Sequence, residues 1–157
     1  MMSTRKSKII KRVIVLSVTL LFVLGILSFV FFNGNAIAKI NGDGNLVVYV
    51  NYFGSADRPS LEMDLDWVRE HEIQLHTNFT RGRMTSGFSN LSVASGHFSG
   101  GDIYAIPTIG FETYEFHANL RVRYVIVLLL RSENRAIVFN DRTSASTREL
   151  YNKLRGI

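Results

Sequence analysis

The chain has 157 residues and a net charge of +5, from 18 Lys and Arg against 13 Asp and Glu. It contains no cysteine, which excludes disulfides, thiolate metal ligands, cysteine nucleophiles and a lipid-modified cysteine. All of the charge excess lies in residues 1–12, which hold five of the 18 cations and no anion, so residues 13–157 are neutral. The sequence pI of about 9.7 therefore reports a basic tail, and we expect no nucleic-acid partner.

Residues 13–32 form an apolar segment in which 16 of 20 residues are apolar and none is charged. A helix of about 20 residues spans the roughly 30 Å hydrocarbon core of a bilayer, so we predict a single transmembrane helix here. Residues 1–12 are then a basic cytoplasmic tail, because cations that flank a membrane segment stay on the cytoplasmic side. Lys39 is the only cation in the 20 residues after the segment, which places the C-terminal domain outside the cytoplasmic membrane.

A cleaved signal peptide is the main alternative to this anchor. Ala36-Ile37-Ala38 matches the small-x-small cleavage pattern, and cleavage near Ala38 would give a secreted protein. The apolar segment is longer than the 7–15 residues usual in signal peptides, which favours the uncleaved anchor. A buried helix in a soluble core is the third possibility.

Residues 33–45 are rich in Asn and Gly and predict a linker, which leaves residues 46–157 as one folded domain. Alternating or β-branched segments predict about seven strands, followed by one terminal helix over 144–154. For that helix the candidate N-caps are Asp141, Thr143 and Ser144, and Ser146 with Glu149 has capping-box spacing. The strand-like segments are 46–53, 61–67, 72–76, 83–101 (as short, bent strands), 102–106, 111–116, 122–130 and 136–139.

Two parts of this domain resemble the bacterial pleckstrin-homology (PH-like) domains of small membrane-anchored proteins. The first is the stretch 83–88 with Gly96-His97-Phe98 and Tyr104. The second is the ending, where strands at 124–127 and 136–140 lead into a helix that carries Thr147 to Tyr151. The resemblance covers roughly residues 45–155. It implies a mainly β fold, a partly open seven-stranded barrel with a C-terminal capping helix, and it supplies no catalytic residues.

No metal or cofactor site is expected. The pair His71-Glu72 with His76 misses the zinc-protease pattern, because Leu75 stands where the second histidine should be. The carboxylates of 62, 64 and 66 alternate along a predicted strand and indicate a solvated face.

Ser95-Gly96-His97 is more typical of a turn than of a nucleophile site, since no Gly-x-Ser-x-Gly elbow is present. The glycine-rich stretch 96–101 lacks the Lys-Ser/Thr ending of a phosphate-binding loop and indicates a bent hairpin. We therefore expect a protein that is not an enzyme.

Four arginines form a candidate patch for anionic ligands. Arg121 and Arg123 alternate on one predicted strand, and Arg81 and Arg83 occupy similar places on another. Together they could bind lipid headgroups or an anionic cell-wall polymer, although solubilising charge on a sheet edge is the simpler interpretation. The leading functional expectation is a membrane-tethered interaction module that binds a protein partner in the cell envelope.

Overall fold

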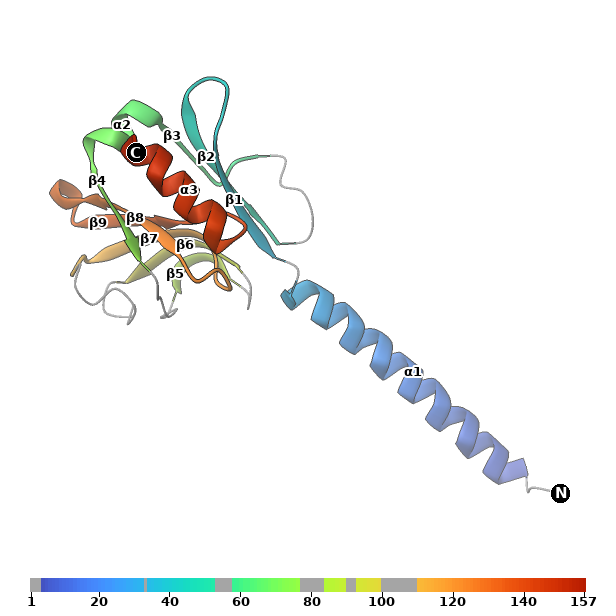
Figure 1. Cartoon of the computed structure of the whole chain (residues 1–157). Helices are drawn as coiled ribbons and strands as arrows, with labels where there is room; N and C mark the ends of the chain where they lie inside the picture. Colours follow the sequence, from blue (N-terminus) through green and yellow to red (C-terminus); the bar gives the residue numbers. More distant parts are fainter. Residues whose placement is uncertain (1–3, 33, 53–57, 77–83, 90–92, 100–109) are drawn as a thin grey trace.

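The structure is a computed structural model that describes residues 4–32, 34–52, 58–76, 84–89, 93–99 and 110–157 (Figure 1). Its parts are an N-terminal apolar helix, two β-sheets and a C-terminal helix. Two of the four predicted patch residues, Arg81 and Arg83, lie outside the described residues, as does the segment 102–106 that we expected to form a strand.

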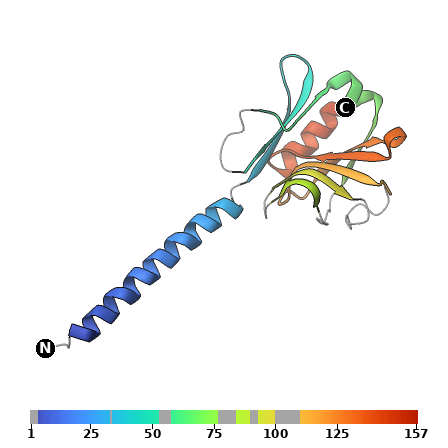
Figure 2. The same ribbon diagram turned by 180° about the vertical axis from the view of Figure 1, so that it is seen from behind.

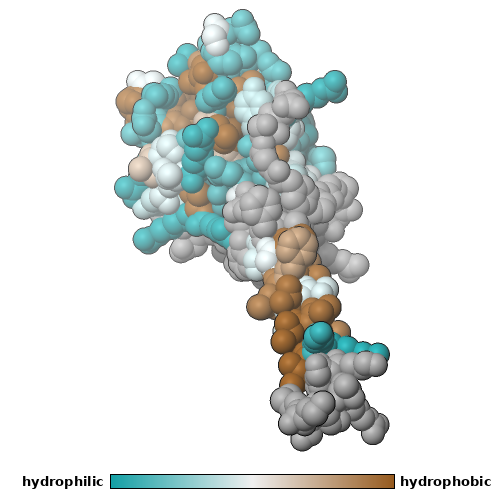
Figure 3. Space-filling view, turned by 90° about the vertical axis from the view of Figure 1, so that its right-hand side faces the viewer, coloured by the Kyte–Doolittle hydropathy of each residue, from teal (hydrophilic) through white to brown (hydrophobic). Residues whose placement is uncertain are grey.

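Helix α1 (Thr4–Phe32) projects from the domain as a separate stem (Figures 1 and 3). Within it, Ile9–Ser28 is long and apolar enough to cross a membrane, and none of this stretch is buried inside the protein. Large apolar side chains such as Leu16 (75% exposed) and Phe22 (69%) face outward. This exposure argues against a buried helix in a soluble core, while length and composition suit either a membrane anchor or a signal sequence.

The first sheet is antiparallel and has the order β1-β2-β3, from β1 (Asn35–Ile40), β2 (Asn45–Asn51) and β3 (Leu61–Asp64). The predicted linker 33–45 was therefore wrong over most of its length, because it forms β1 and a tight turn. In that turn the Asn41 side-chain oxygen accepts from the backbone N–H groups of Asp43 and Asn45. Residue 32 of α1 is thus separated from the sheet by two residues.

The expected strand over 61–67 also ends early. Asp64 terminates β3 and caps helix α2 (Leu65–Glu70), with its carboxylate accepting from the backbone N–H of Trp67 at 2.8 Å. Asp is a strong N-cap residue, so the cap overrides the alternating pattern. Glu62 and Asp64 remain on β3, whereas Asp66 lies on α2, so the three carboxylates do not share one strand face.

The second sheet has six strands in the order β4-β8-β9-β7-β6-β5. β7 and β9 are parallel and the other neighbouring pairs are antiparallel. The predicted hairpin at the C-terminal end is confirmed, and its turn places Asn134 in the left-handed region at φ 49°. The strands are β4 (Glu72–His76), β5 (Met84–Ser89), β6 (Val93–Ser99), β7 (Thr113–Asn119), β8 (Val125–Leu130) and β9 (Arg135–Phe139).

Helix α3 (Ser144–Arg155) confirms the predicted terminal helix. Thr143 is its N-cap, accepting from the backbone N–H of Ser146, and the Ser146 hydroxyl accepts in return from the Thr143 N–H. The capping box is therefore Thr143 with Ser146, and the expected pairing of Ser146 with Glu149 was wrong. Gly156 ends the helix at φ 70°, a conformation that glycine adopts without strain.

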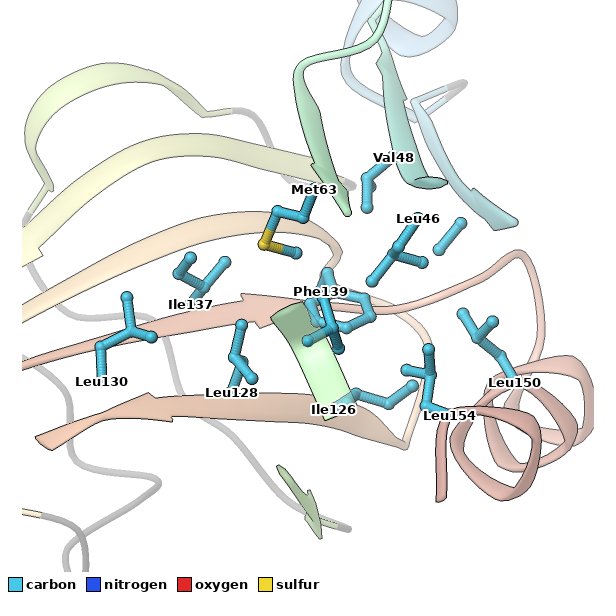
Figure 4. Packing of buried hydrophobic residues seen from close by; sticks show 12 residues of the cluster. Leu46, Val48, Met63, Ile126, Leu128, Leu130, Ile137, Phe139, Leu150 and Leu154 are labelled. Carbon is cyan, nitrogen blue, oxygen red and sulfur yellow. The ribbon is translucent and has the colours of Figure 1, made fainter. Parts of the chain in front are cut away.

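The main core lies between the two sheets and α3 (Figure 4). Each of its fully buried side chains contributes roughly 1.5–3 kcal/mol. A second cluster, with Tyr114, Phe98 and Phe116, lies on the opposite face of the six-stranded sheet. In the main core, Leu46, Val48 and Met63 of the small sheet meet Ile126, Leu128, Leu130, Ile137 and Phe139 of the large sheet and Leu150 and Leu154 of α3.

The described strands number more than the seven expected, and the two sheets keep free ends within the described chain rather than closing into a barrel. β1 and β2 lie against β7, and α3 packs over the adjoining strands β4 and β8 (Figure 2). The fold is therefore two β-sheets that pack against each other, with α3 in contact with both.

Candidate functional site

An open groove runs between β4 and α3, and we call it the edge groove. It has a volume of about 830 Å³ and is lined by α2, by β4 and by the last residues of α3. β4 is the end strand of the large sheet, and among the described strands only β8 pairs with it. The backbone N–H and C=O groups of β4 alternate in direction, so those that point away from β8 have no strand partner in the described part of the chain.

The floor of the edge groove is apolar. Ile73 and Leu75 point from β4 toward the main core, where they are half-buried, and Leu154 of α3 is 1% exposed beneath them. Tyr151 adds a half-buried ring from the helix side. Alternation along β4 is what places two apolar side chains on this face, because successive side chains of a strand point to opposite faces.

Two arginines flank the end of the groove at which β4 begins. Arg69 of α2 is 46% exposed and forms an ion pair with Asp66 at 3.6 Å, with the Asp66 side chain 89% exposed. Arg155 of α3 donates to the Tyr151 hydroxyl at 3.2 Å. The C-terminal end of α3 lies beside α2 in both views (Figures 1 and 2), so these cations share one end. An exposed ion pair of this length contributes little, so the Arg69 guanidinium can exchange Asp66 for the carboxylate of a ligand.

The opposite face of β4 carries a chain of hydrogen bonds whose members on β4 also line the edge groove. Arg131 donates through Nη2 and Nε to Glu72 at 2.6 and 3.0 Å, Gln74 donates to Glu72 at 2.7 Å, and His76 Nε2 lies 3.0 Å from Gln74 Oε1. The bonds from Arg131, then Gln74, hold the pKa of Glu72 below its usual value. Burial lowers the pKa of His76. The Glu72 charge is thus already paired and does not offset the two cations of the groove.

A second surface lies where α1 leaves the domain. Asn35, three residues beyond α1, accepts a hydrogen bond from the Asn119 side chain at 3.1 Å. The turn that follows Asn119 carries Arg121 and Arg123, both exposed. The predicted strand 122–130 begins only at residue 125, so these arginines lie in a turn and not on one face of a strand.

Two arginine side chains lie against the ring of Tyr124, beside this turn. The Arg148 guanidinium lies 4.2 Å from the centre of that ring and donates to the Tyr124 hydroxyl, and the Arg123 guanidinium lies 5.9 Å from the same ring. We call Arg121, Arg123 and Arg148 the basic turn. Arg148 was not among the predicted patch residues, since only the fold brings α3 next to the start of β8.

Asn140 fixes the shape of the basic turn. It is fully buried, accepts from the Asn119 backbone N–H at 2.7 Å, and donates to the carbonyl oxygens of Asn119 at 2.9 Å and Tyr124 at 3.2 Å. These bonds tie the end of β7 to the start of β8 across the end of β9. Sequence reasoning noted Asn140 only as part of the family resemblance and did not assign it this role.

A third polar cluster joins β6 and β7. Ser95 and His117 are register partners, with Ser95 Oγ 3.2 Å from His117 Nδ1, and His117 Nε2 lies 2.8 Å from Glu115 Oε1. Arg135 also bonds Glu115 at 3.1 Å. The hydrogen bond from His117 is the main reason that the pKa of Glu115 lies below its usual value. Burial raises the pKa of Tyr52, which hydrogen-bonds with Ser95.

This cluster has the order hydroxyl, imidazole, carboxylate that acyl-transfer enzymes use. With Nε2–H donating to Glu115, Nδ1 of His117 is free to accept the Ser95 proton. Ser95 nevertheless lies inside β6, which is paired with β5 on one side and β7 on the other. The backbone N–H groups of the strand therefore donate to the neighbouring strands and do not form an oxyanion hole. The expected turn at Ser95-Gly96-His97 was wrong, because these residues lie in the middle of a strand.

His71 and His76, which miss the zinc-protease pattern in the sequence, do not lie together in the structure either. His71 caps the end of α2, with Nδ1 2.8 Å from the Trp67 carbonyl oxygen, and His76 faces Gln74. Within the described residues there is no group of three His, Asp or Glu side chains that could hold a metal ion. Comparison with known proteins finds no matching family model, no matching curated protein and no matching solved structure.

Proposed function

We propose that this protein is a non-enzymatic, membrane-tethered interaction module whose domain lies outside the cytoplasmic membrane and binds a protein partner in the cell envelope. Helix α1 serves as the anchor, with the basic N-terminus in the cytoplasm. The PH-like relationship is part of the proposal, and the helix that packs over the open side of the sheets supports it.

The edge groove is the observation that supports protein binding. It combines a strand edge with no partner among the described strands, an apolar floor and two arginines at one end, and these are the elements of a peptide-binding surface. The two residues between α1 and β1 hold the domain close to the bilayer. Such tethering raises the effective concentration of the groove for other membrane proteins.

Site-specific photo-crosslinking in intact cells tests this function. A photoreactive amino acid at Gln74, which lines the groove, is compared with the same residue at Asp43, in the exposed turn between β1 and β2. We expect a discrete crosslinked envelope protein from position 74 and none from position 43. No crosslink from position 74, or the same products from both positions, would contradict the proposal.

Binding of anionic lipid headgroups or cell-wall polymer is the second candidate function. The position of the basic turn favours it, because Arg121 and Arg123 lie next to the strand that follows the anchor. Anionic surfaces attract such residues by about 1 kcal/mol per Lys or Arg.

Hydrogen–deuterium exchange of the full chain in nanodiscs tests this candidate. We expect the backbone at 120–124 to exchange more slowly in discs with 30% anionic lipid than in zwitterionic discs. The double variant Arg121→Ala/Arg123→Ala should lose this difference, whereas Arg131→Ala/Lys153→Ala, which removes the same charge elsewhere, should keep it. Equal exchange in both kinds of disc would exclude lipid as the ligand.

A further inference from the structure

We infer that the edge groove accepts an extended peptide segment by strand addition to β4, with the acidic end of that segment at Arg69 and Arg155. This inference rests on the proposed function and names the chemistry of the partner at the same site.

The length of the paired segment follows from β4. The strand has five residues, which at about 3.4 Å per residue span roughly 17 Å. An added strand of the same length would satisfy the backbone groups of β4 that point away from β8. Main-chain pairing of this kind supplies affinity with little regard to sequence.

The groove sets which side chains suit the added strand. One face of the segment would lie over the apolar floor of Ile73, Leu75 and Leu154, so alternate residues should be apolar. Polar residues in between would face away from the floor. Val, Ile and Thr satisfy both requirements, because branched side chains favour an extended backbone.

Charge complementarity sets the direction of the segment. Arg69 and Arg155 lie at the end of the groove where β4 begins, and the nearby Glu72 is already bonded to Arg131. An antiparallel segment places its C-terminal end there, so carboxylates should follow the alternating residues. A second copy that paired antiparallel through its own β4 would bring the His76 end of that strand to the two arginines and would supply no carboxylate there.

Three synthetic peptides and the full-length protein in nanodiscs test the inference. The first is a fluorescent, N-acetylated Thr-Val-Thr-Val-Thr-Asp-Glu. The second replaces Asp-Glu with Lys-Lys, and the third carries N-methyl groups on alternate amides, which removes the strand hydrogen bonds. Fluorescence anisotropy reports binding, and hydrogen–deuterium exchange reports protection of the β4 amides.

We expect the first peptide to bind and to protect β4, and each of the other two to bind at least tenfold more weakly. Arg69→Ala/Arg155→Ala should weaken the first peptide at least tenfold, whereas Lys153→Ala, a cation of α3 already paired with Glu149, should leave it unchanged. Absence of binding by the first peptide, or binding that N-methylation does not weaken, would overturn strand addition.

Two further outcomes separate the alternatives. Dimers in analytical ultracentrifugation with β4 protected in the absence of peptide would overturn the inference in favour of a second copy as occupant. If position 74 gives a discrete crosslink but N-methylation does not weaken peptide binding, the proposed function stands and strand addition to β4 is wrong.

Discussion

Removing the Asn140 side chain should destabilise the domain by about 2–4 kcal/mol. The side chain makes three hydrogen bonds, two with Asn119 and one with the Tyr124 carbonyl oxygen, at 2.7, 2.9 and 3.2 Å. Each contributes about 0.5–1.5 kcal/mol net, and a buried partner left without its bond costs about 1–3 kcal/mol. Because Asn140 is fully buried, water cannot replace what Asn140→Ala removes.

Urea unfolding of the full chain in detergent, followed by the fluorescence of Trp67, measures this loss. With a slope of about 2 kcal/mol per molar urea, the midpoint should fall by about 1–2 M. Asn152→Ala is the matched control, since Asn152 is exposed on α3, and its midpoint should move little. If Asn140→Ala behaves like this control, the account of the basic turn is wrong.

Four further predictions concern single residues. The hydrogen bond from His117 lowers the pKa of Glu115, so ionised Glu115 stabilises the fold above its unfolded pKa of about 4.5. This contribution disappears as the pH falls through the lowered value. The free energy of unfolding, measured from pH 3 to 7, should therefore depend less on pH in Glu115→Gln. Thr143→Ala removes the N-cap of α3 and should cost about 1 kcal/mol in urea unfolding. Leu154→Ala opens the floor of the edge groove and should cost about 2–5 kcal/mol by the same measurement. A fluorophosphonate probe should leave Ser95 unmodified in mass spectrometry, and labelling that disappears in His117→Ala would contradict a non-enzymatic protein.

The parts of the fold with strong local signals were predictable from the sequence. The apolar stretch of α1, the hairpin of β8 and β9, and the terminal helix α3 all appear where periodicity and composition place them. Each depends on hydrophobic pattern and on caps within a few residues, which a single sequence contains. The α2 helix was missed because its six residues are too few to show a helical hydrophobic pattern.

The candidate sites were much less predictable, because each depends on contacts between distant segments. Ser95 meets His117 only through the register of β6 with β7, and Arg148 meets Tyr124 only because α3 packs beside β8. The predicted alternation placed β4 as a strand but could not show that it lies at the end of a sheet next to α3. Sheet order is set by long-range packing, so no local pattern reports it.

The central claim is that α1 anchors the chain with its domain outside the cytoplasmic membrane. Because the chain has no cysteine, single substitutions give a clean test with a membrane-impermeant maleimide in intact cells. Ser132→Cys, in the exposed turn between β8 and β9, should react at once, whereas Lys11→Cys should react only after permeabilisation. Reaction of Lys11→Cys in intact cells with protection of Ser132→Cys would contradict the account.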